Sequence, residues 1–300
     1  MINYDPHKWL DHFFDIRGSM LREILWRVSI CVLWSVGVVA AYKYGVKLAI
    51  PSTIHTLVGL ALGLLLVFRT NASYDRFWEG RKLWGGIVNE TRNLVRAAGQ
   101  FLHNDPALLR RLAFWTAAFP YATMHHLRGK QDLGEAAIDL PPAEVTAAVE
   151  AEHTPMAVSV RMSECLTEAR RRGYLSEYTQ MAIDQNVQLL VDYLGGCERI
   201  RKTPLPFAYV VHLRRALVLY CFTLPFALVE TFGWTTVVDT LLVSYVFFGI
   251  EEIGVEIEGP FGYDDNDLPL EQICDAIRGN VLALAGARLD EVEPPMPGAL

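Results

Sequence analysis

Long uncharged segments alternate with charged segments along this chain, and several of them have the length of a membrane-spanning helix. The clearest runs from residue 48 to residue 68, which is 21 residues without a formal charge between Lys47 and Arg69. A helix needs about 20 apolar residues to cross the hydrocarbon core of a bilayer. The pattern therefore predicts a membrane span over 48–68.

Three further segments are long and poor in charge. The first covers the 15 residues between Arg27 and Lys43 and has aromatic residues at both ends, which is typical of membrane interfaces. The other two are 216–229 and 231–250, and Asp239 is the one charged residue in the latter. With the span over 48–68, these segments predict four membrane-spanning helices.

Basic residues flank the spans unevenly. Three arginines between positions 17 and 27 precede the first span, and four basic residues follow the second between positions 69 and 82, whereas the short connection between them holds only Lys43 and Lys47. Lysine and arginine accumulate on the cytoplasmic side of spans. We therefore expect both termini and the long connection between the second and third spans to be cytoplasmic.

That long connection, residues 71–203, has the pattern of a water-soluble helical region. Apolar residues such as Trp84, Val88 and Val95 recur at steps of three and four, which places them on one helix face. Further helices are expected at 107–127, 155–172 and 174–201, and strand-like alternation is absent beyond a few residues. The sequence thus predicts an all-α integral membrane protein with a large cytosolic helical region. Its expected parts are a cytosolic N-terminal segment (1–27), two spans (28–70), the cytosolic helical region (71–203), two spans (204–254) and a cytosolic C-terminal segment (255–300).

Composition agrees with a protein that lies partly in a bilayer and partly in water. Apolar residues make up 52% and charged residues 20% of the chain, and the mean hydropathy is +0.21. The net charge of −7 argues against a nucleic-acid partner, because such binding needs a basic surface. The five cysteines are widely spaced and form no CxxC pair, so we expect reduced, buried side chains.

The span over 48–68 carries two regular features. Leu60, Leu64 and Phe68 recur every four residues along one helix face, and Gly59 and Gly63 form a GxxxG motif on the neighbouring face. In one interpretation the apolar face contacts lipid and the glycines admit a second helix. In the other, several copies of the span surround an axis, the apolar residues form a hydrophobic constriction that closes by dewetting, and the glycines contact the next helix.

Four blocks of the sequence resemble the bestrophin family, specifically its bacterial homologues. They are "RGSM" at 17–20, "IPSTIHTLVGLALGLLLVFRTNASYDRFWEGRKLWGG" at 50–86, "TPLPFAYVVHLRRALVLYCFTLPFAL" at 203–228 and "EEIGVEIEGPFGYDDNDLPLE" at 251–271. The resemblance covers about residues 9 to 290. It implies a helical homopentameric ion channel in the cell inner (plasma) membrane, with a central pore on the fivefold axis. It also implies that the partners are further copies of the chain, the lipid bilayer and inorganic ions.

The resemblance also implies roles for particular residues. The family's pore neck falls on Leu60, Leu64 and Phe68, the three residues that the periodicity singles out, and a cytoplasmic aperture falls on Leu205 between two prolines.

Animal members of the family hold calcium with an acidic cluster and backbone groups of the N-terminal segment. The corresponding candidate ion-binding cluster here is Asp264, Asp265 and Asp267, but the family's asparagine before the proline is Gly259. One side-chain ligand is therefore missing, so calcium binding is doubtful and we expect no required cofactor. A solvated turn that caps the next helix is the other interpretation of this cluster.

Other classes of function find less support in the sequence. A P-loop, an HExxH motif, a nucleophile elbow and an EF-hand are all absent, so we expect no enzyme. The pair His125 and His126 is expected to be a surface or core pair and not a metal site.

The family's best-known activity favours chloride and other monovalent anions as the permeant ions. A sodium-selective monovalent cation channel of the same fold and a non-conducting membrane scaffold stay open as alternatives.

Overall fold

The computed structural model describes His7 and residues 18–290, and within that part of the chain every regular element is a helix. The chain divides into two compact units. The first unit consists of Met1–Trp78 and Thr203–Asp267, and the second unit of Glu79–Lys202 and Leu268–Leu300. The all-helical fold class predicted from the sequence is confirmed for the described residues.

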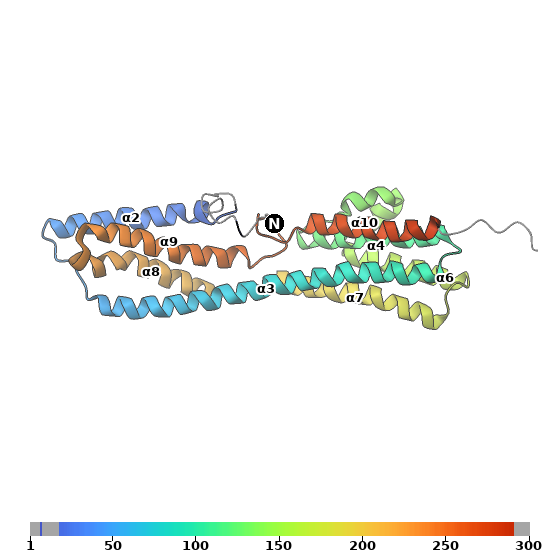
Figure 1. Ribbon diagram of the computed structural model, residues 1–300, viewed down its shortest axis with the longest axis horizontal. Helices are drawn as coiled ribbons and strands as arrows, with labels where there is room; N and C mark the ends of the chain where they lie inside the picture. Colours follow the sequence, from blue (N-terminus) through green and yellow to red (C-terminus); the bar gives the residue numbers. More distant parts are fainter. Residues whose placement is uncertain (1–6, 8–17, 291–300) are drawn as a thin grey trace, which may run out of the picture. The chain divides into compact units, whose positions relative to one another are not determined.

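The first unit contains helices that are long and apolar enough to cross a membrane. Three helical stretches meet this criterion by length and composition, namely Leu21–Lys43, Ser52–Phe101 and Phe207–Glu256. The first is α2 and the second is α3. The third contains α8 (Phe207–Phe232) and α9 (Thr236–Glu256), which are joined by the short turn η2 (Gly233–Thr235). Figure 1 shows α8 and α9 folding back on each other at this turn, where Gly233 has a φ of +53°.

The core of the first unit is a cluster of aliphatic and small side chains from all four helices. It contains Ile24, Val28 and Cys31 of α2, Leu62 and Leu66 of α3, Leu213, Leu217 and Cys221 of α8, and Phe248 of α9. Between α2 and α9 the packing is partly polar, since Thr240 donates a hydrogen bond to Ser35 with the two hydroxyl oxygens 3.2 Å apart. Short hydroxyl side chains allow close approach of apolar helices and still satisfy their own polar atoms.

Helix α3 is longer than the sequence pattern suggested. The pattern predicted a membrane span over 48–68 and a helix around Trp84, and the structure joins both in one helix of 50 residues from Ser52 to Phe101. The charged residues after Phe68 mark the point where the apolar part of the helix gives way to a part suited to water. They do not interrupt the backbone hydrogen bonds of the helix. Gly86 does not break the helix either, and it allows the Tyr193 ring to lie where a Cβ atom would be only 2.5 Å away.

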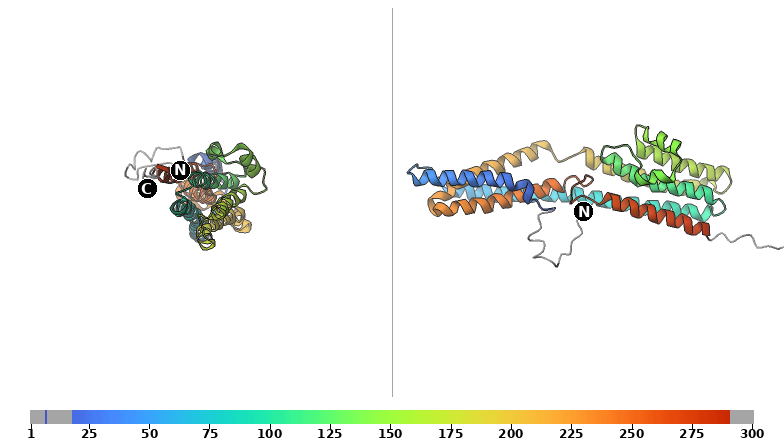
Figure 2. Two further views of the ribbon diagram at one scale, coloured as in Figure 1. Left: turned by 90° about the vertical axis from the view of Figure 1, so that its right-hand side faces the viewer. Right: turned by 90° about the horizontal axis from the view of Figure 1, so that it is seen from above.

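The second unit is built around α4 (Pro106–Leu127), which packs against both α6 (Thr154–Arg171) and α10 (Leu270–Asp290). Figures 1 and 2 show α10 running beside α4 in this unit. The other elements of the unit are η1 (Gly134–Asp139), α5 (Pro142–Val149), α7 (Glu177–Lys202) and the second part of α3.

The helices predicted at 107–127, 155–172 and 174–201 are confirmed, with small differences at their ends. The C-terminal helix, expected to be part of a separate terminal segment, belongs to the second unit because of its packing on α4. All five cysteines are free and buried, as predicted.

Candidate functional site

One face of α3 in the first unit presents apolar side chains that its own chain does not cover. Leu60 is 76% exposed, Leu64 is 56% exposed and Phe68 is 57% exposed, whereas Leu62 and Leu66 are buried in the core of the unit. Successive residues turn by about 100° around a helix, so residues two apart lie on nearly opposite sides. The three predicted neck residues therefore point away from the core of their own subunit. We call Leu60, Leu64 and Phe68 the apolar stripe.

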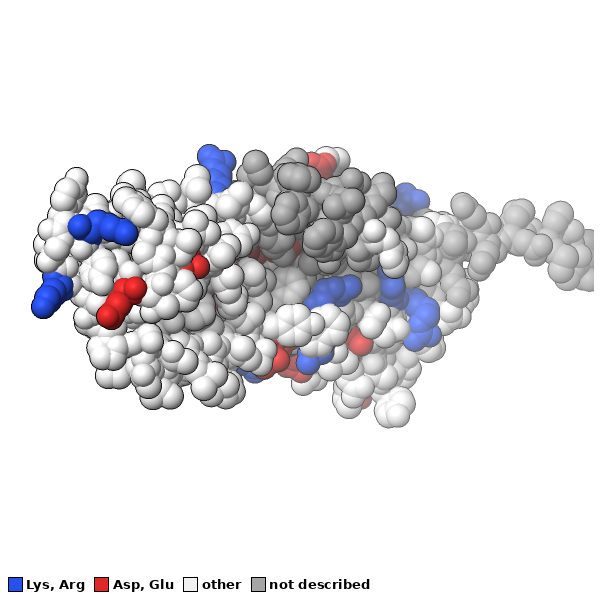
Figure 3. Space-filling model, turned by 60° about the vertical axis from the view of Figure 1, so that its left-hand side comes forward, with Lys and Arg blue, Asp and Glu red and all other residues white. Residues whose placement is uncertain are grey.

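Exposure alone does not distinguish the apolar stripe, because apolar side chains cover much of the first unit. Leu33 of α2, Leu219 of α8 and Leu242 of α9 are also exposed. Figure 3 shows a broad face of the molecule with few charged side chains. A surface of this kind and size needs a lipid bilayer or further protein against it. What distinguishes the apolar stripe is the polar network at its Phe68 end.

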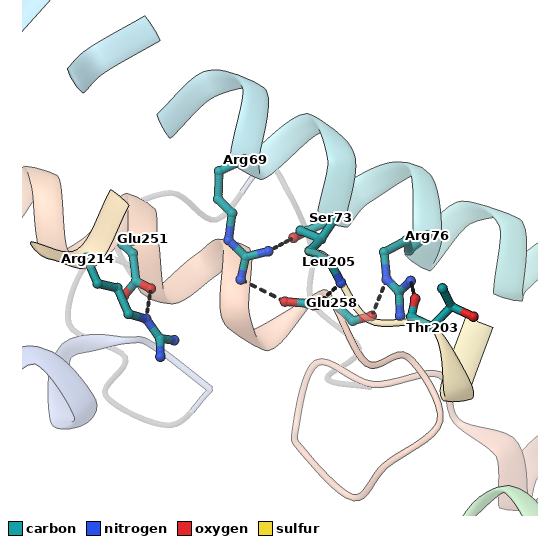
Figure 4. A network of polar contacts seen from close by, with 8 residues as sticks. All are labelled: Arg69, Ser73, Arg76, Thr203, Leu205, Arg214, Glu251 and Glu258. Carbon is teal, nitrogen blue, oxygen red and sulfur yellow. Dashed lines mark hydrogen bonds and ion pairs between the residues drawn. The ribbon is translucent and has the colours of Figure 1, made fainter. Parts of the chain in front are cut away.

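That network begins with Arg69, the residue directly after Phe68. Its side chain is only 1% exposed, and it donates hydrogen bonds to Glu258 Oε2 at 2.7 Å and to Ser73 Oγ at 3.2 Å. Glu258 lies just beyond the end of α9, and its second oxygen, Oε1, accepts a hydrogen bond from the backbone N–H of Leu205 at 2.9 Å. Figure 4 shows Glu258 between Arg69 and Leu205. One carboxylate thus joins α3 to the turn that carries the predicted aperture residue.

A second arginine of α3 holds the same turn. Arg76 donates to the backbone carbonyl of Glu258 at 3.2 Å and to the backbone carbonyl of Thr203 (Figure 4). Burial raises the pKa of Glu258, but the hydrogen bonds from Leu205 and Arg69 lower it more, so its pKa lies below the usual range. Glu258 is therefore ionised at neutral pH and pairs with Arg69 as a charged partner.

Leu205 is half-buried in a short non-helical turn between α7 and α8. Helix α7 ends at Lys202 and α8 begins at Phe207. Pro204 and Pro206 flank Leu205, and proline removes a backbone donor and restricts φ. No regular helix runs through this segment, as the two prolines predict. The hydrogen bonds of Glu258 and Arg76 hold the turn against the Phe68 end of the apolar stripe.

The two glycines of the GxxxG motif have different surroundings. A Cβ atom on Gly59 would come 2.6 Å from the hydroxyl of Tyr220 on α8 of the same chain, whereas a Cβ on Gly63 would meet nothing within 4 Å. The Tyr220 ring is itself stacked on His55, with ring centroids 4.9 Å apart. The close approach at Gly59 therefore serves packing between α3 and α8 within the subunit. Gly63 remains open to a neighbour.

The acidic cluster forms a structured turn after α9. Asp267 is buried, and its Oδ2 accepts a hydrogen bond from the backbone N–H of Asp264 at 2.9 Å, whereas Asp264 and Asp265 are exposed. Between them, Asn266 donates to the backbone carbonyl of Gly18 at 3.1 Å and to Glu256 Oε1 at 3.2 Å. An amide group thus links the N-terminal segment to this turn. This geometry favours the turn interpretation for Asp267.

Two further ion pairs lie among the apolar helices of the first unit. Arg214 of α8 donates to Glu251 Oε1 at 2.8 Å, and Arg27 of α2 donates to Glu252 Oε2 at 2.5 Å. Arginine and glutamate are costly at membrane depth unless they are paired. The sequence showed Arg214 and Arg27 as charges beside apolar segments, but their partners and the Arg69–Glu258 pair were not anticipated.

Among the described residues, three potential metal ligands come together at one place, namely His126, His153 and Glu198 in the second unit. His126 thus lies next to His153 and Glu198, and the prediction of a simple His125–His126 pair does not describe its surroundings.

Comparison with known proteins identifies the family. The model of the family described as "Bacterial/Fungal Bestrophin protein" matches residues 1–283. A voltage-dependent anion channel-forming protein of Nostoc sp. is 41% identical over 277 residues, which cover 91% of this chain and 90% of that protein. The voltage-dependent anion channel-forming protein YneE of Escherichia coli K12 is 35% identical over 298 residues, covering 98% of this chain and 96% of that protein.

A solved structure leads to the same family. The crystal structure of a bacterial bestrophin homologue from Klebsiella pneumoniae matches with a TM-score of 0.83 at 33% identity, covering 88% of this chain and 98% of that one. The sequence resemblance is therefore confirmed across nearly the whole length. The chain belongs to the bacterial and fungal bestrophin family.

Proposed function

We propose that this chain is the subunit of a homopentameric membrane channel that conducts monovalent anions, chloride foremost. The names of its relatives describe proteins that form voltage-dependent anion channels. The proposal is carried by the apolar stripe of Leu60, Leu64 and Phe68. These side chains are exposed in the isolated subunit. Five copies of α3 around one axis place these side chains in stacked rings.

Such rings make a neck that water wets poorly. Leucine and phenylalanine offer no hydrogen bonds to replace the hydration shell of an ion, so a narrow apolar passage closes by dewetting. Gating then needs only a small widening of the axis. Leu205 supplies a second constriction, the cytoplasmic aperture, because the Glu258 and Arg76 hydrogen bonds hold its turn in place.

The sign of the permeant ion depends on charges and dipoles outside the neck, since apolar rings discriminate mainly by size and dehydration. The names of the relatives favour anions. A sodium-selective cation channel with the same neck is the alternative, and the net charge of −7 is the observation that favours it. In a non-conducting scaffold, the third possibility, α3 would face lipid or a partner helix instead of an ion path.

In the proposed assembly each subunit crosses the inner (plasma) membrane four times, through α2, the first part of α3, α8 and α9. Both termini and the second unit lie in the cytoplasm, as the distribution of lysine and arginine predicts. The partners are other copies of the chain, lipid and inorganic ions. We assign no enzymatic activity, no nucleic-acid partner and no required cofactor.

Reconstitution of the purified protein in a planar bilayer under a NaCl gradient tests the function directly. An anion channel gives a reversal potential near the chloride equilibrium potential, and a sodium-selective channel gives one near the sodium equilibrium potential. Native mass spectrometry in mild detergent tests the assembly, with the pentamer expected as the main species. Monomers or dimers alone, or bilayers without current, would contradict the channel.

A further inference from the structure

Two histidines and a glutamate from three different helices converge in the second unit. His126 lies in the last turn of α4, His153 is the N-cap residue of α6 and Glu198 lies near the end of α7. One potential ligand atom from each residue lies within 4.8 Å of the other two. These residues are far apart in the sequence, so the fold alone brings them together. We call them the His–His–Glu cluster.

The two imidazoles point at the same atom. The Nε2 atom of His126 lies 2.7 Å from Glu198 Oε1, and the Nε2 atom of His153 lies 2.8 Å from the same oxygen. The two rings are stacked with centroids 4.4 Å apart and an angle of 29° between their planes. The stacking keeps both Nε2 atoms on the same side of the pair, next to the carboxylate.

The chemistry of the donor atoms suits metal binding. Burial lowers the pKa of His126. Burial raises the pKa of Glu198, but the hydrogen bonds from His153 and His126 lower it further than burial raises it, so the side chain is a carboxylate. Neutral imidazole and ionised carboxylate are the forms that coordinate metal ions.

We propose that His126, His153 and Glu198 form a binding site for a divalent transition metal ion of the zinc type. Two histidine nitrogens and one carboxylate oxygen are a donor set found in zinc sites that keep a fourth position for water. Zinc bonds of about 2.0–2.1 Å in a tetrahedron place ligand atoms about 3.3 Å apart. The present separations of 2.7 Å and 2.8 Å therefore need to widen by about half an ångström, a movement that side-chain rotation provides.

The cluster is also accessible to an ion and to the water that completes its coordination. The exposed fractions of the three side chains are 22% for His126, 34% for His153 and 18% for Glu198. Lys202 lies 3.5 Å from the other carboxylate oxygen, Oε2, and its side chain is 69% exposed. This ammonium group can move into solvent when a divalent cation replaces it beside Glu198.

Metal binding changes the positions of protons in a defined way. A carboxylate oxygen only accepts hydrogen bonds, so both Nε2 atoms carry a proton in the metal-free cluster. Each Nε2 that coordinates the ion gives its proton to solvent, and the Nδ1 of the same ring takes one up, so that the imidazole stays neutral. In His153, Nδ1 now accepts a long hydrogen bond from the backbone N–H of Met156 at 3.4 Å, and coordination through Nε2 replaces that weak cap. In return, the ion joins the ends of α4, α6 and α7.

The test is zinc binding by the full-length protein in detergent, after removal of metal with a chelator. ZnCl₂ is added, excess ion is removed by gel filtration and bound zinc is counted by elemental analysis. We expect about one zinc per subunit in the wild type, as one site implies. His153→Gln and Glu198→Gln each remove one ligand, so the affinity should fall by about tenfold or more. His103→Gln is the matched control, because His103 is exposed and outside the cluster, and it should bind as the wild type does.

A second measurement requires no substitution. Co²⁺ added in place of zinc gives intense visible absorption bands when its coordination is tetrahedral, and zinc should displace it. The thermal unfolding temperature should rise with zinc in the wild type and in His103→Gln but not in Glu198→Gln, which keeps the size of the side chain. Equal zinc binding by the wild type, His153→Gln and Glu198→Gln would overturn the proposal. A wild type that binds no zinc and gives no tetrahedral Co²⁺ spectrum would also overturn it. These outcomes do not depend on whether the protein conducts ions.

Discussion

The buried Arg69 forms an ion pair with the half-buried Glu258, with Nη2 and Oε2 2.7 Å apart, although 189 positions separate them in the sequence. Arg69 directly follows the apolar stripe, and Glu258 also holds the backbone N–H of Leu205. The pair therefore connects the two predicted constrictions within one subunit. A buried charge that loses its partner is strongly destabilising, which makes this connection open to test.

Glu258→Gln removes the negative charge but keeps the shape of the side chain. We expect a loss of about 3–5 kcal/mol in stability, because Arg69 stays buried without a charged partner. Thermal unfolding in detergent, followed by tryptophan fluorescence, measures the change. Glu150→Gln is the control, because Glu150 is exposed, and it should leave the unfolding temperature unchanged. Equal unfolding temperatures for both variants would show that the pair contributes little.

The same pair predicts a pH dependence. The folded-state pKa of Glu258 lies below its usual value, so its stabilising contribution is complete above the unfolded pKa of about 4.3 and is lost as the pH falls through the folded pKa. The difference in unfolding temperature between the wild type and Glu258→Gln should therefore be largest at neutral pH and shrink below about pH 4. A difference that stays constant down to the acid limit would exclude Glu258 as the titrating group.

Some parts of the fold and site were predictable because they depend on local patterns. The four apolar segments, the helices at 107–127 and 155–172 and the non-helical turn around Leu205 follow from helix periodicity and from proline. The spacing of four placed Leu60, Leu64 and Phe68 on one helix face, and the structure shows that this face points away from the core. Local pattern did not show that the span over 48–68 and the helix around Trp84 are one helix, which continues to Phe101.

The parts that were not predicted depend on contacts between distant residues. Arg69 could be recognised as a charge at the end of a span, but nothing in its neighbourhood identifies Glu258 as its partner. The environment of Gly59 depends in the same way on Tyr220, a residue of another helix. His126, His153 and Glu198 come from three helices, and a spacing rule detects only ligands that share one helix or one loop.

The GxxxG motif offers two substitutions that differ by four positions. Gly59→Ala places a methyl group 2.6 Å from the Tyr220 hydroxyl, so we expect a loss of about 1–3 kcal/mol in stability from overpacking. The Cβ of Gly63→Ala meets nothing within 4 Å in the described part of the chain, so the subunit fold should be preserved. The variant should alter the oligomer only if Gly63 contacts another copy of the chain. Unfolding temperature and native mass spectrometry separate the two effects. Similar destabilisation by both variants would contradict the different roles.

The turn at Leu205 predicts a change in conduction without a change in folding. Leu205→Ala truncates a half-buried side chain, while the backbone N–H that bonds Glu258 is retained. We expect altered relative permeabilities among anions of different size and altered rectification in planar bilayers. Leu189→Ala, a truncation at an exposed leucine of α7, is the control and should conduct as the wild type does. Unchanged permeability ratios for Leu205→Ala would mean that Leu205 is only a structural part of the turn and does not form an aperture.

The acidic turn after α9 allows a test of the Asn266 hydrogen bonds and a test of calcium binding. Asn266→Asp replaces a donor with a carboxylate that faces the carbonyl of Gly18 and the side chain of Glu256, so we expect a loss of about 1–3 kcal/mol in stability. For the wild type we expect no change in unfolding temperature or in current when CaCl₂ is added. Calcium-dependent opening of the wild type would contradict the expectation that no cofactor is required.

Substitutions on the two opposite faces of α3 test the proposed neck. Replacing Leu60, Leu64 and Phe68 together by alanine removes side chains that the subunit leaves exposed, so the fold should survive. A wider, less apolar neck wets more easily, and we expect larger or less gated currents. On the other face, Leu62→Ala or Leu66→Ala opens a cavity in the core of the first unit and should cost about 2–5 kcal/mol. Single-channel recording and unfolding temperature together separate these outcomes. A triple variant that assembles correctly and keeps wild-type conductance and gating would mean that these side chains face lipid and that the ion path lies elsewhere.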